Sequence, residues 1–522
     1  MASYSFTGTP SGDTFVGGDS GGSAVGNSGN DSLTGGTGAD TLYGNSGDDT
    51  LVGSDGPDVV YGGSENDSIS EGNGADQIFG GEGLDTITTG NGNSTIVGGE
   101  DSTDLADSIT AGNGNNVIFG NGGNDTIVGG TGSNVIIGGA GNDSLTSGGK
   151  TAFINGNLGD DVITAVSGAD TVNGGAGSDT ITLTSGTGGD IVTGGIGSDS
   201  INLSAATGSE TILGGNGVDG DTTDSADTLV GGASSDLIYG NYGADSIVGG
   251  TGNNTLVGGH DADTITGDTG NDLVYGNQGA DIIAAGKGAD TIFAGQDNDS
   301  VTVIDGATDL VYGGLGGDTI DASATTTQQT IYGGADSVGT GDGADSLTGG
   351  SKSDLIYGGA GDDTITGGAN NDTLSGGAGS DRFIETTKGD SYTFANGNVL
   401  ATDAIIDFNA DDVDQLVTGA TTKFVDSQVQ SFNNTTSLAA GANAAIVSAL
   451  AVDTANNGGT AADNVAAIFT ISGANGAASH TYLAVDTDGS GTFGNNGAAD
   501  GSDVLVDITG FQGQLTTKNF SA

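Results

Sequence analysis

Several residue types that stabilise or functionalise proteins are scarce in this chain. Among its 522 residues there is no cysteine and no tryptophan, and proline occurs twice. Without cysteine no disulfide can form, so an exported chain of this composition must be stabilised in another way. Lysine and arginine together number 7 against 68 aspartates and glutamates, which gives a formal net charge of -61. A chain this acidic repels nucleic acid and anionic membrane surfaces.

Long apolar runs are also missing. No run of about 18 apolar residues occurs, so we expect no membrane span. The first residues, MASYSFTGTPSGDTF, lack the basic and apolar regions of a secretory signal peptide, and we expect no cleaved leader. The repeats described below begin almost at once, so we also expect no catalytic domain ahead of them.

Histidine is too rare to support common catalytic arrangements. The stretch GDSGG at Gly18–Gly22 resembles a serine-hydrolase signature, but a nucleophilic serine needs a base. The chain has only His260 and His480, and His260 lies inside a repeat turn. Glycine and serine are so abundant that the match is expected by chance. We therefore predict that the protein is not an enzyme.

Glycine, in contrast, is abundant, and its 107 copies follow a period. From Gly8 to Ile384 the chain repeats the nonapeptide G-G-x-G-x-D-x-U-x, in which U is Leu, Ile, Val or Phe. Clear copies are Gly35–Tyr43, Gly138–Thr146 and Gly358–Thr366. There are about 39 units, and a short fixed period outranks any local motif as a guide to the fold.

The nonapeptide predicts an all-β fold. Each unit divides into a six-residue turn, GGxGxD, and a three-residue strand, xUx, whose U side chain points inward. Two units complete one coil, so we predict a long parallel β-roll (a β-solenoid) with two sheets and about 19 coils. The predicted domains are a lead-in at 1–7, the roll at 8–384 and a small mixed C-terminal capping and secretion domain at 385–522.

The C-terminal region departs from the repeat. Residues 391–416 have the pattern of short strands that close the end of a solenoid. Residues 435–456 are alanine-rich with apolar spacing, which favours a helix. The stretches AAIFTIS, TYLAVDT and SDVLVDI are predicted strands.

The sixth position of the unit holds the candidate chemistry. It is Asp in about 31 units, and stacking of the coils places these carboxylates a few Å apart. Such a row is repulsive without a cation. Carboxylates and carbonyls of glycine-rich turns are ligands that suit Ca²⁺, so we predict multiple Ca²⁺ ions, whose binding is coupled to folding.

Alternate units lie on opposite edges of the roll, so the candidate ligands fall into two ladders when the units are numbered from Gly8. The odd units form the continuous ladder, with Asp13, Asp31, Asp49, Asp67, Asp85, Asp107, Asp125, Asp143, Asp161, Asp179, Asp199, Asp227, Asp245, Asp263, Asp281, Asp299, Asp318, Asp345, Asp363 and Asp381. The even units form the interrupted ladder, with Asp40, Asp58, Asp76, Asp170, Asp190, Asp236, Asp272, Asp290, Asp309, Asp354 and Asp372.

Exceptions at the sixth position, and the aromatic residues at the ninth position, are confined to the even units. The sixth-position exceptions are Gly22, Ser94, Asn116, Asn134, Ala152, Glu210, Asn254 and Gln329. The ninth-position aromatics are Tyr43, Tyr61, Phe79, Phe119, Tyr239, Tyr275, Phe293, Tyr312, Tyr332 and Tyr357. One edge is therefore expected to be fully loaded with Ca²⁺ and the other interrupted. The aromatics predict an outward ladder on one sheet, either as stiffening by cross-strand stacking or as a lateral contact surface.

Three enlarged acidic turns recur about 12 units apart on the odd edge, at Gly98–Thr110, Gly214–Val230 and Gly333–Thr348. Their spacing indicates duplication of a larger block. The additional aspartates are interpreted as further Ca²⁺ ligands, as a bridge to another molecule, or as tolerated surface insertions.

A separate Ca²⁺ site is predicted in the C-terminal domain. In DTDGSGTF, Asp486 and Asp488 match the first and third positions of an EF-hand-like loop. The twelfth position is Gly497 instead of Glu, so the complete loop is not supported. Asp500 or Asp503 would then have to complete the site.

The nonapeptides resemble the RTX (repeats-in-toxin) calcium-binding β-roll family, over residues 8–384. The stretches Asp403–Leu416 and Thr481–Phe493 are similar to the regions that follow the repeats in type I-secreted RTX proteins. The resemblance implies export guided by the C-terminus without cleavage, an unfolded chain at low cytosolic Ca²⁺, and folding outside the cell. Because no further domain is recognised ahead of the repeats, the chain resembles repeat-only RTX surface-layer and coat proteins.

From these features we predict an extracellular, Ca²⁺-stabilised structural protein that self-associates at the cell surface as an S-layer, coat or filament. The alternative is a secreted adhesin or glycan-binding module whose enlarged turns hold a cell-surface polysaccharide. Assembly of the purified protein with Ca²⁺ favours the first, and polysaccharide binding by isolated monomers favours the second.

Overall fold

The computed structural model describes residues 3–216, 224–304, 306–334 and 341–384, and the backbone of short strands between 394 and 521. The chain divides into two compact units, Met1–Thr264 and Ile265–Ala522, which are described separately. Within the described residues every regular element is a β-strand, as the nonapeptide predicts. A search of those residues for helices long and apolar enough to cross a membrane finds none.

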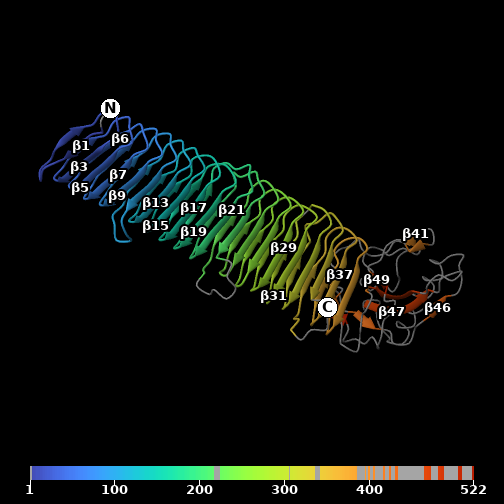
Figure 1. Cartoon of the computed structure of the whole chain (residues 1–522). Coiled ribbons are helices and arrows are strands. Elements are labelled where there is room, and N and C mark those ends of the chain that lie inside the picture. Colours follow the sequence, from blue (N-terminus) through green and yellow to red (C-terminus); the bar gives the residue numbers. More distant parts are fainter. Residues whose placement is uncertain are drawn as a thin grey trace. The chain divides into compact units, whose positions relative to one another are not determined.

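In the first unit each strand pairs in parallel with the strand two places later, so odd-numbered and even-numbered strands form separate sheets. Figure 1 shows these strands side by side, in blue to green. The long-strand sheet contains β1 (Ser5–Thr7), β3 (Ser23–Ser28), β5 (Thr41–Ser46), β7 (Val59–Ser64), β9 (Gln77–Glu82), β11 (Thr95–Gly99), β13 (Val117–Gly122), β15 (Val135–Ala140), β17 (Phe153–Leu158), β19 (Thr171–Ala176), β21 (Ile191–Ile196), β23 (Thr211–Gly215), β25 (Leu237–Asn241) and β27 (Thr255–Gly259).

The short-strand sheet of the first unit is formed by the odd repeat units. It contains β2 (Thr14–Val16), β4 (Ser32–Thr34), β6 (Thr50–Ser54), β8 (Ser68–Glu71), β10 (Thr86–Thr88), β12 (Ser108–Thr110), β14 (Thr126–Val128), β16 (Ser144–Thr146), β18 (Val162–Ala165), β20 (Thr180–Leu183), β22 (Ser200–Asn202), β24 (Thr228–Val230) and β26 (Ser246–Val248). The next strand in the chain is β28 (Thr264–Thr266).

The second unit repeats the arrangement. Its long-strand sheet contains β29 (Leu273–Gln278), β31 (Thr291–Gln296), β33 (Leu310–Leu315), β35 (Thr330–Gly334), β37 (Leu355–Ala360) and β39 (Thr373–Ala378). Its short-strand sheet contains β30 (Ile282–Ala284), β32 (Ser300–Thr302), β34 (Thr319–Asp321), β36 (Ser346–Thr348), β38 (Thr364–Thr366) and β40 (Arg382–Ile384). The predicted parallel β-roll is thus confirmed in both units.

Short strands follow the repeats in the second unit. They are β41 (Phe394–Ala395), β42 (Asn398–Val399), β43 (Ala404–Ile405), β44 (Gln415–Val417), β45 (Thr422–Phe424), β46 (Gln430–Phe432), β47 (Asn464–Ile471), β48 (His480–Asp486), β49 (Val504–Asp507) and β50 (Phe520–Ser521). Strand β43 pairs in parallel with β39, and β44 with β40, which adds one coil to the roll. Strands β47, β48 and β49 pair antiparallel and confirm the three strands predicted there. The helix predicted at 435–456 lies outside the described residues.

The U residues of both sheets form the core. Leu42 of β5 and Leu51 of β6 are each 0% exposed, and the same holds along most of both sheets. The residues on either side of each U position are more exposed, because side chains alternate across a strand. This inward row fixes which residues begin each turn, and so places the sixth-position side chains at the edges.

Glycine is required where the turns of successive coils approach. Gly47 has a φ of 120°, a conformation that side chains disfavour. At Gly44 an added Cβ would collide with Asp49 Oδ2. The repeat therefore combines a glycine that permits the turn with a glycine that leaves space for the carboxylate.

Candidate metal centre: two ladders of turn side chains

The continuous ladder is a row of buried, hydrogen-bonded aspartates. The backbone N–H of each aspartate donates to Oδ1 of the aspartate one coil later, as in Asp31 to Asp49 (2.7 Å) and Asp49 to Asp67 (2.8 Å). The row is unbroken from Asp13 to Asp263 in the first unit. It is also unbroken from Asp281 to Asp381 in the second. The structure thus brings these predicted residues together on one edge of each unit.

The second carboxylate oxygen of most of these aspartates has no hydrogen-bond partner, although it is buried. This applies to Oδ2 of Asp31, Asp49, Asp67, Asp85, Asp107, Asp125, Asp143, Asp161, Asp179, Asp199, Asp227, Asp245, Asp299, Asp318 and Asp345. A buried charge without a partner is strongly unfavourable. A row of such oxygens therefore fits a row of cations, and the oxygen-only chemistry suits Ca²⁺.

The pKa values of these carboxyl groups are raised, which means that the ionised form is unfavourable in the absence of a cation. Burial, followed by repulsion from carboxylates one coil away, raises the pKa of Asp67 to about 8. The pKa of Asp245 is raised to about 9 for the same reasons. Hydrogen bonds from the preceding coil lower both pKa values but do not offset the burial. In the first coil, Oδ2 of Asp13 has hydrogen-bond partners, because it accepts from the backbone N–H and the hydroxyl of Thr9.

The interrupted ladder keeps most of its hydrogen bonds despite its substitutions. Asp76 N–H donates to Ser94 Oγ (3.4 Å), Ser94 N–H to Asn116 Oδ1 (2.9 Å) and Asp309 N–H to Gln329 Oε1 (2.7 Å). Glu210 accepts from Asp190 N–H and places a carboxylate in the row, so it continues the ladder. Ala152 has no side-chain acceptor. The expected interruption therefore affects the charges more than the hydrogen bonds.

Amide groups replace carboxylate oxygens at several of these substituted turns. Asn116 Nδ2 donates to the carbonyls of Gly112 (3.2 Å), Gly114 (3.3 Å) and Gly129 (3.3 Å). Asn134 Nδ2 donates to two carbonyls of its own turn, and Gln329 Nε2 to carbonyls of Ala307 and Thr327. These contacts identify the carbonyls that face the sixth-position side chain. Where that side chain is Asp, the same carbonyls and the free carboxylate oxygen could hold a cation together.

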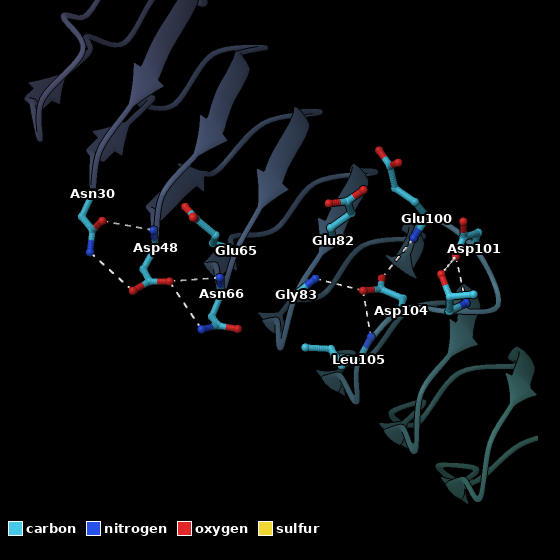
Figure 2. Close-up of a pocket in the computed structure, with 11 residues that line it drawn as sticks. Asn30, Asp48, Glu65, Asn66, Glu82, Gly83, Glu100, Asp101, Asp104 and Leu105 are labelled. Atoms are coloured by element: carbon cyan, nitrogen blue, oxygen red, sulfur yellow. Dashed lines mark hydrogen bonds between the residues drawn. The ribbon is translucent and has the colours of Figure 1, made fainter.

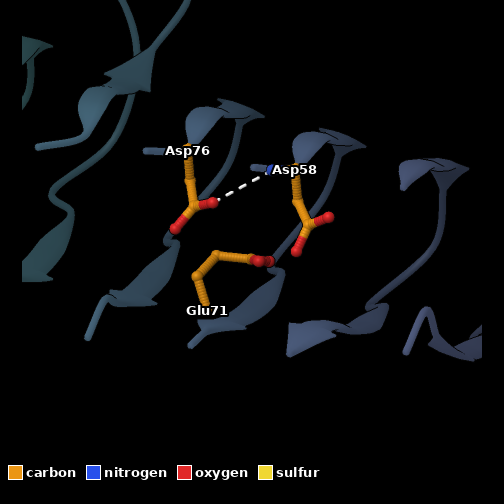
Figure 3. Close-up of side chains that lie close together, drawn as sticks. All are labelled: Asp58, Glu71 and Asp76. Atoms are coloured by element: carbon orange, nitrogen blue, oxygen red, sulfur yellow. Dashed lines mark hydrogen bonds between the residues drawn. The ribbon is translucent and has the colours of Figure 1, made fainter. Parts of the chain in front are cut away.

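Glu71 is a ligand candidate that the sequence reasoning missed. It replaces the first glycine of its unit, and that substitution was the available signal. Its carboxylate lies between those of Asp58 and Asp76, as Figure 3 shows. Burial, then repulsion from Asp58 and Asp76, raises the pKa of Glu71 to about 9.

The enlarged acidic turns also contribute carboxylates that were not individually predicted. An added Cβ at Gly99, Gly215 or Gly334 would collide with Oδ2 of Asp104, Asp224 or Asp342 respectively, so the three turns place an aspartate equivalently. In the first turn Asp104 accepts hydrogen bonds from Gly83 N–H (2.9 Å) and Glu100 N–H (3.1 Å). It bounds an acidic groove of about 690 Å³. Figure 2 shows Asp48, Glu65 and Glu82 along that groove.

The predicted aromatic ladder consists of separate runs. In the first unit Tyr43, Tyr61 and Phe79 stack with ring centroids 4.9–5.0 Å apart. In the second unit the stacked rings are Tyr275, Phe293, Tyr312, Tyr332 and Tyr357. Phe119 pairs across the sheet with Val97 and Ile137, and Tyr239 with Leu213 and Val257, so these rings have aliphatic neighbours.

The predicted C-terminal site cannot be placed in the same way. Asp486 is the last residue of β48, and Asp488 lies outside the described residues. The EF-hand-like arrangement of these two residues stays a prediction.

Together, the parallel roll and its carboxylate-lined turns define a calcium-binding β-roll protein. A family model, the RTX calcium-binding nonapeptide repeat, matches residues 7–42, 16–51, 25–60, 43–78, 52–87, 71–105, 101–136, 119–149, 152–181, 221–256, 239–274, 275–302, 339–374 and 348–383. These segments cover more than half of the chain, which therefore belongs to the RTX calcium-binding nonapeptide repeat family. Proteins with these repeats are typically secreted. No curated protein matches the chain.

Proposed function

We propose that this chain is a secreted, non-enzymatic structural protein that folds on extracellular Ca²⁺ and assembles at the cell surface as an S-layer or related coat. The observation that carries the proposal is the row of buried Oδ2 atoms without hydrogen-bond partners, as at Asp125 and Asp143. With little Ca²⁺ in the cytosol these charges oppose folding. At millimolar Ca²⁺ outside the cell, binding and folding become one event.

The role of each ladder residue follows from its position. The sixth-position aspartates of both ladders supply carboxylate oxygens to Ca²⁺, and the carbonyls that Asn116 contacts mark the backbone ligands. Glu210 supplies the equivalent carboxylate from a longer side chain. Asn116, Asn134 and Gln329 hold their turns without an ion, since their amides already bind the carbonyls.

Assembly is supported by the outer face of the long-strand sheet. It carries half-buried stacked rings in each unit, and Tyr61 is 37% exposed. Contiguous exposed apolar residues are typical of interaction surfaces. A non-catalytic role is supported by His260, whose ring stacks on Tyr242 with centroids 4.1 Å apart inside the repeat turns.

The test is electron microscopy and light scattering of the purified full chain. Sheets or filaments should form with Ca²⁺ and disperse with EGTA. The double variant Tyr61→Ser, Tyr332→Ser should assemble less while its Ca²⁺-dependent circular dichroism is retained. A matched control, Thr88→Ser on the short-strand sheet, should assemble like the wild type. Monomers in both conditions would contradict the coat proposal.

The acidic groove supports a second candidate, an adhesin or glycan-binding module. Asp48, Glu65 and Glu82 line the groove, and Ca²⁺ held there could bridge to sugar hydroxyls or carboxylates. Surface plasmon resonance with cell-surface polysaccharide should then detect Ca²⁺-dependent binding by monomers. The double variant Glu65→Gln, Glu82→Gln should weaken it. Equal binding by this variant and the wild type would contradict the groove as the binding site.

A further inference from the structure

Glu71 interrupts the repeat at a point where the backbone is also irregular. It is the last residue of β8, and the parallel pairing of β8 with β6 shifts register between Val52 and Ser54. The shift pairs Ser54 with Glu71. Side chains alternate across a strand, so Glu71, two residues after the core residue Ile69, points into the edge of the roll instead of toward solvent, and it is 6% exposed.

The carboxylate of Glu71 completes a group of three. One oxygen each from Asp58, Glu71 and Asp76 lies within 4.8 Å of the other two, and both aspartates are 1% exposed. Figure 3 shows the glutamate between the two aspartates. Gly53 provides the space, because an added Cβ there would collide with Glu71 Oε2.

The hydrogen bonds leave one oxygen of each group available. Glu71 Oε1 accepts from Gly53 N–H (3.1 Å), and Asp76 Oδ1 accepts from Asp58 N–H (3.0 Å). Oε2 of Glu71 and Oδ2 of Asp58 and Asp76 are buried without a hydrogen-bond partner. All three groups are hydrogen-bond acceptors. None of them offers an N–H donor, such as the Asn116 amide, that could hold the turn without an ion. Three buried carboxylates that lie close together repel one another, and a cation with a preference for oxygen ligands would remove that cost.

We propose that Asp58, Glu71 and Asp76 form a tricarboxylate cation site that binds Ca²⁺, and its trivalent analogues, more tightly than the ladder turns that lack a third carboxylate. Affinity of oxygen-ligand sites rises with the number of charged ligands. The site lies where carboxylates of the interrupted ladder give way to Ser94 and Asn116. It therefore stabilises the last turns with carboxylates before the coils whose sixth position is uncharged. The inference rests on Ca²⁺ binding by the roll but not on assembly.

The experiment uses the full chain saturated with Ca²⁺ and titrated with Tb³⁺ as the probe. Bound Tb³⁺ is counted by mass spectrometry of the metal after gel filtration. Glu71→Gln preserves the acceptor for Gly53 N–H and removes the charge, while Glu71→Gly restores the glycine of the repeat. Asp19→Asn is the control, because it removes one carboxylate charge from an exposed position outside the ladders and the acidic groove.

The wild type and Asp19→Asn should retain one Tb³⁺ against excess Ca²⁺. Both Glu71 variants should lose that ion, with affinity reduced at least about tenfold. Their circular dichroism at saturating Ca²⁺ should match the wild type, which separates loss of the site from misfolding. Unchanged Tb³⁺ retention in folded Glu71→Gln would overturn the proposal and assign Glu71 a proton shared with Asp58. A site that survives while assembly fails would instead refute only the coat function.

Discussion

The continuous and interrupted ladders have similar hydrogen bonds but different charges. In the continuous ladder every rung is an aspartate, and each is hydrogen-bonded to the coil before it. In the interrupted ladder Ser94, Asn116 and Gln329 accept the same hydrogen bonds without a charge. The comparison separates two tasks of the sixth position: holding successive coils together, and binding cations. Uncharged side chains can perform the first task, whereas Ca²⁺ binding needs carboxylates.

The largest effect should follow removal of Ca²⁺ at neutral pH. With the cations gone, both ladders hold buried charges, and the continuous ladder holds more of them. We expect loss of the β-sheet signal in far-ultraviolet circular dichroism on addition of EGTA. Retention of the full signal would contradict the role assigned to the unpartnered oxygens.

Protonation of the ladder carboxyl groups at low pH should partly substitute for Ca²⁺ in stabilising the folded state. Burial raises the pKa of Asp107 to about 8 and that of Asp58 to about 6, from an ordinary value of 3.8. Because the folded state binds protons more tightly, protonation stabilises it below the unfolded pKa, and this stability is lost as pH rises through about 6 to 8. The Ca²⁺-free protein should therefore regain β-structure near pH 5. A transition that runs in the opposite direction would exclude these pKa shifts.

A matched pair of substitutions compares the ladders directly. Asp143→Ala leaves Asp125 N–H without its acceptor, and Asp170→Ala does the same to Ala152 N–H, each at a cost of about 1–3 kcal/mol. Asp143 has ladder carboxylates on both sides, whereas Asp170 follows Ala152. The Ca²⁺ concentration at half-folding should therefore rise more for Asp143→Ala. Equal increases would mean that the two edges do not differ in Ca²⁺ dependence.

Asn116→Asp should convert an amide-filled turn into a cation site. The substitution keeps an acceptor for Ser94 N–H but removes the donor to three carbonyls. We expect one additional Ca²⁺ in isothermal titration calorimetry and a greater Ca²⁺ requirement for folding. Asn115→Asp introduces the same charge at an exposed position and should leave the stoichiometry unchanged.

Glu210→Gln should have the smallest effect. Glutamine can still accept from Asp190 N–H, as Gln329 accepts from Asp309 N–H in the same ladder. The free energy of unfolding at saturating Ca²⁺, measured by chemical denaturation, should fall less than in Asp170→Ala, because the hydrogen bond between coils is kept. A loss as large as that of Asp170→Ala would show that the charge of Glu210 matters more than its hydrogen bond.

Much of the site was predictable because the repeat couples position to environment. Ile69 and Leu51 are core residues on successive coils, and Asp67 lies two residues before Ile69. Any register that buries both core residues therefore places Asp67 in a turn at the edge of the roll. The consequences of the exceptions were less predictable. Glu210 was counted as a departure, but its longer side chain reaches the ladder. Phe119 was assigned to an aromatic ladder, but its cross-strand neighbours are Val97 and Ile137.

The sequence by itself determined the parallel roll, the separation of the two edges and the Ca²⁺-binding class, because a nine-residue period dictates which side chains point inward and which lie in turns. Only the tertiary structure decided what each turn side chain contacts. The amide of Asn116 reaches a carbonyl of the next coil, and the carboxylate of Glu71 lies close to those of Asp58 and Asp76. Such contacts join residues that are distant in the sequence, 13 positions apart for Asn116 and Gly129, so they depend on how successive coils align and not on the local motif.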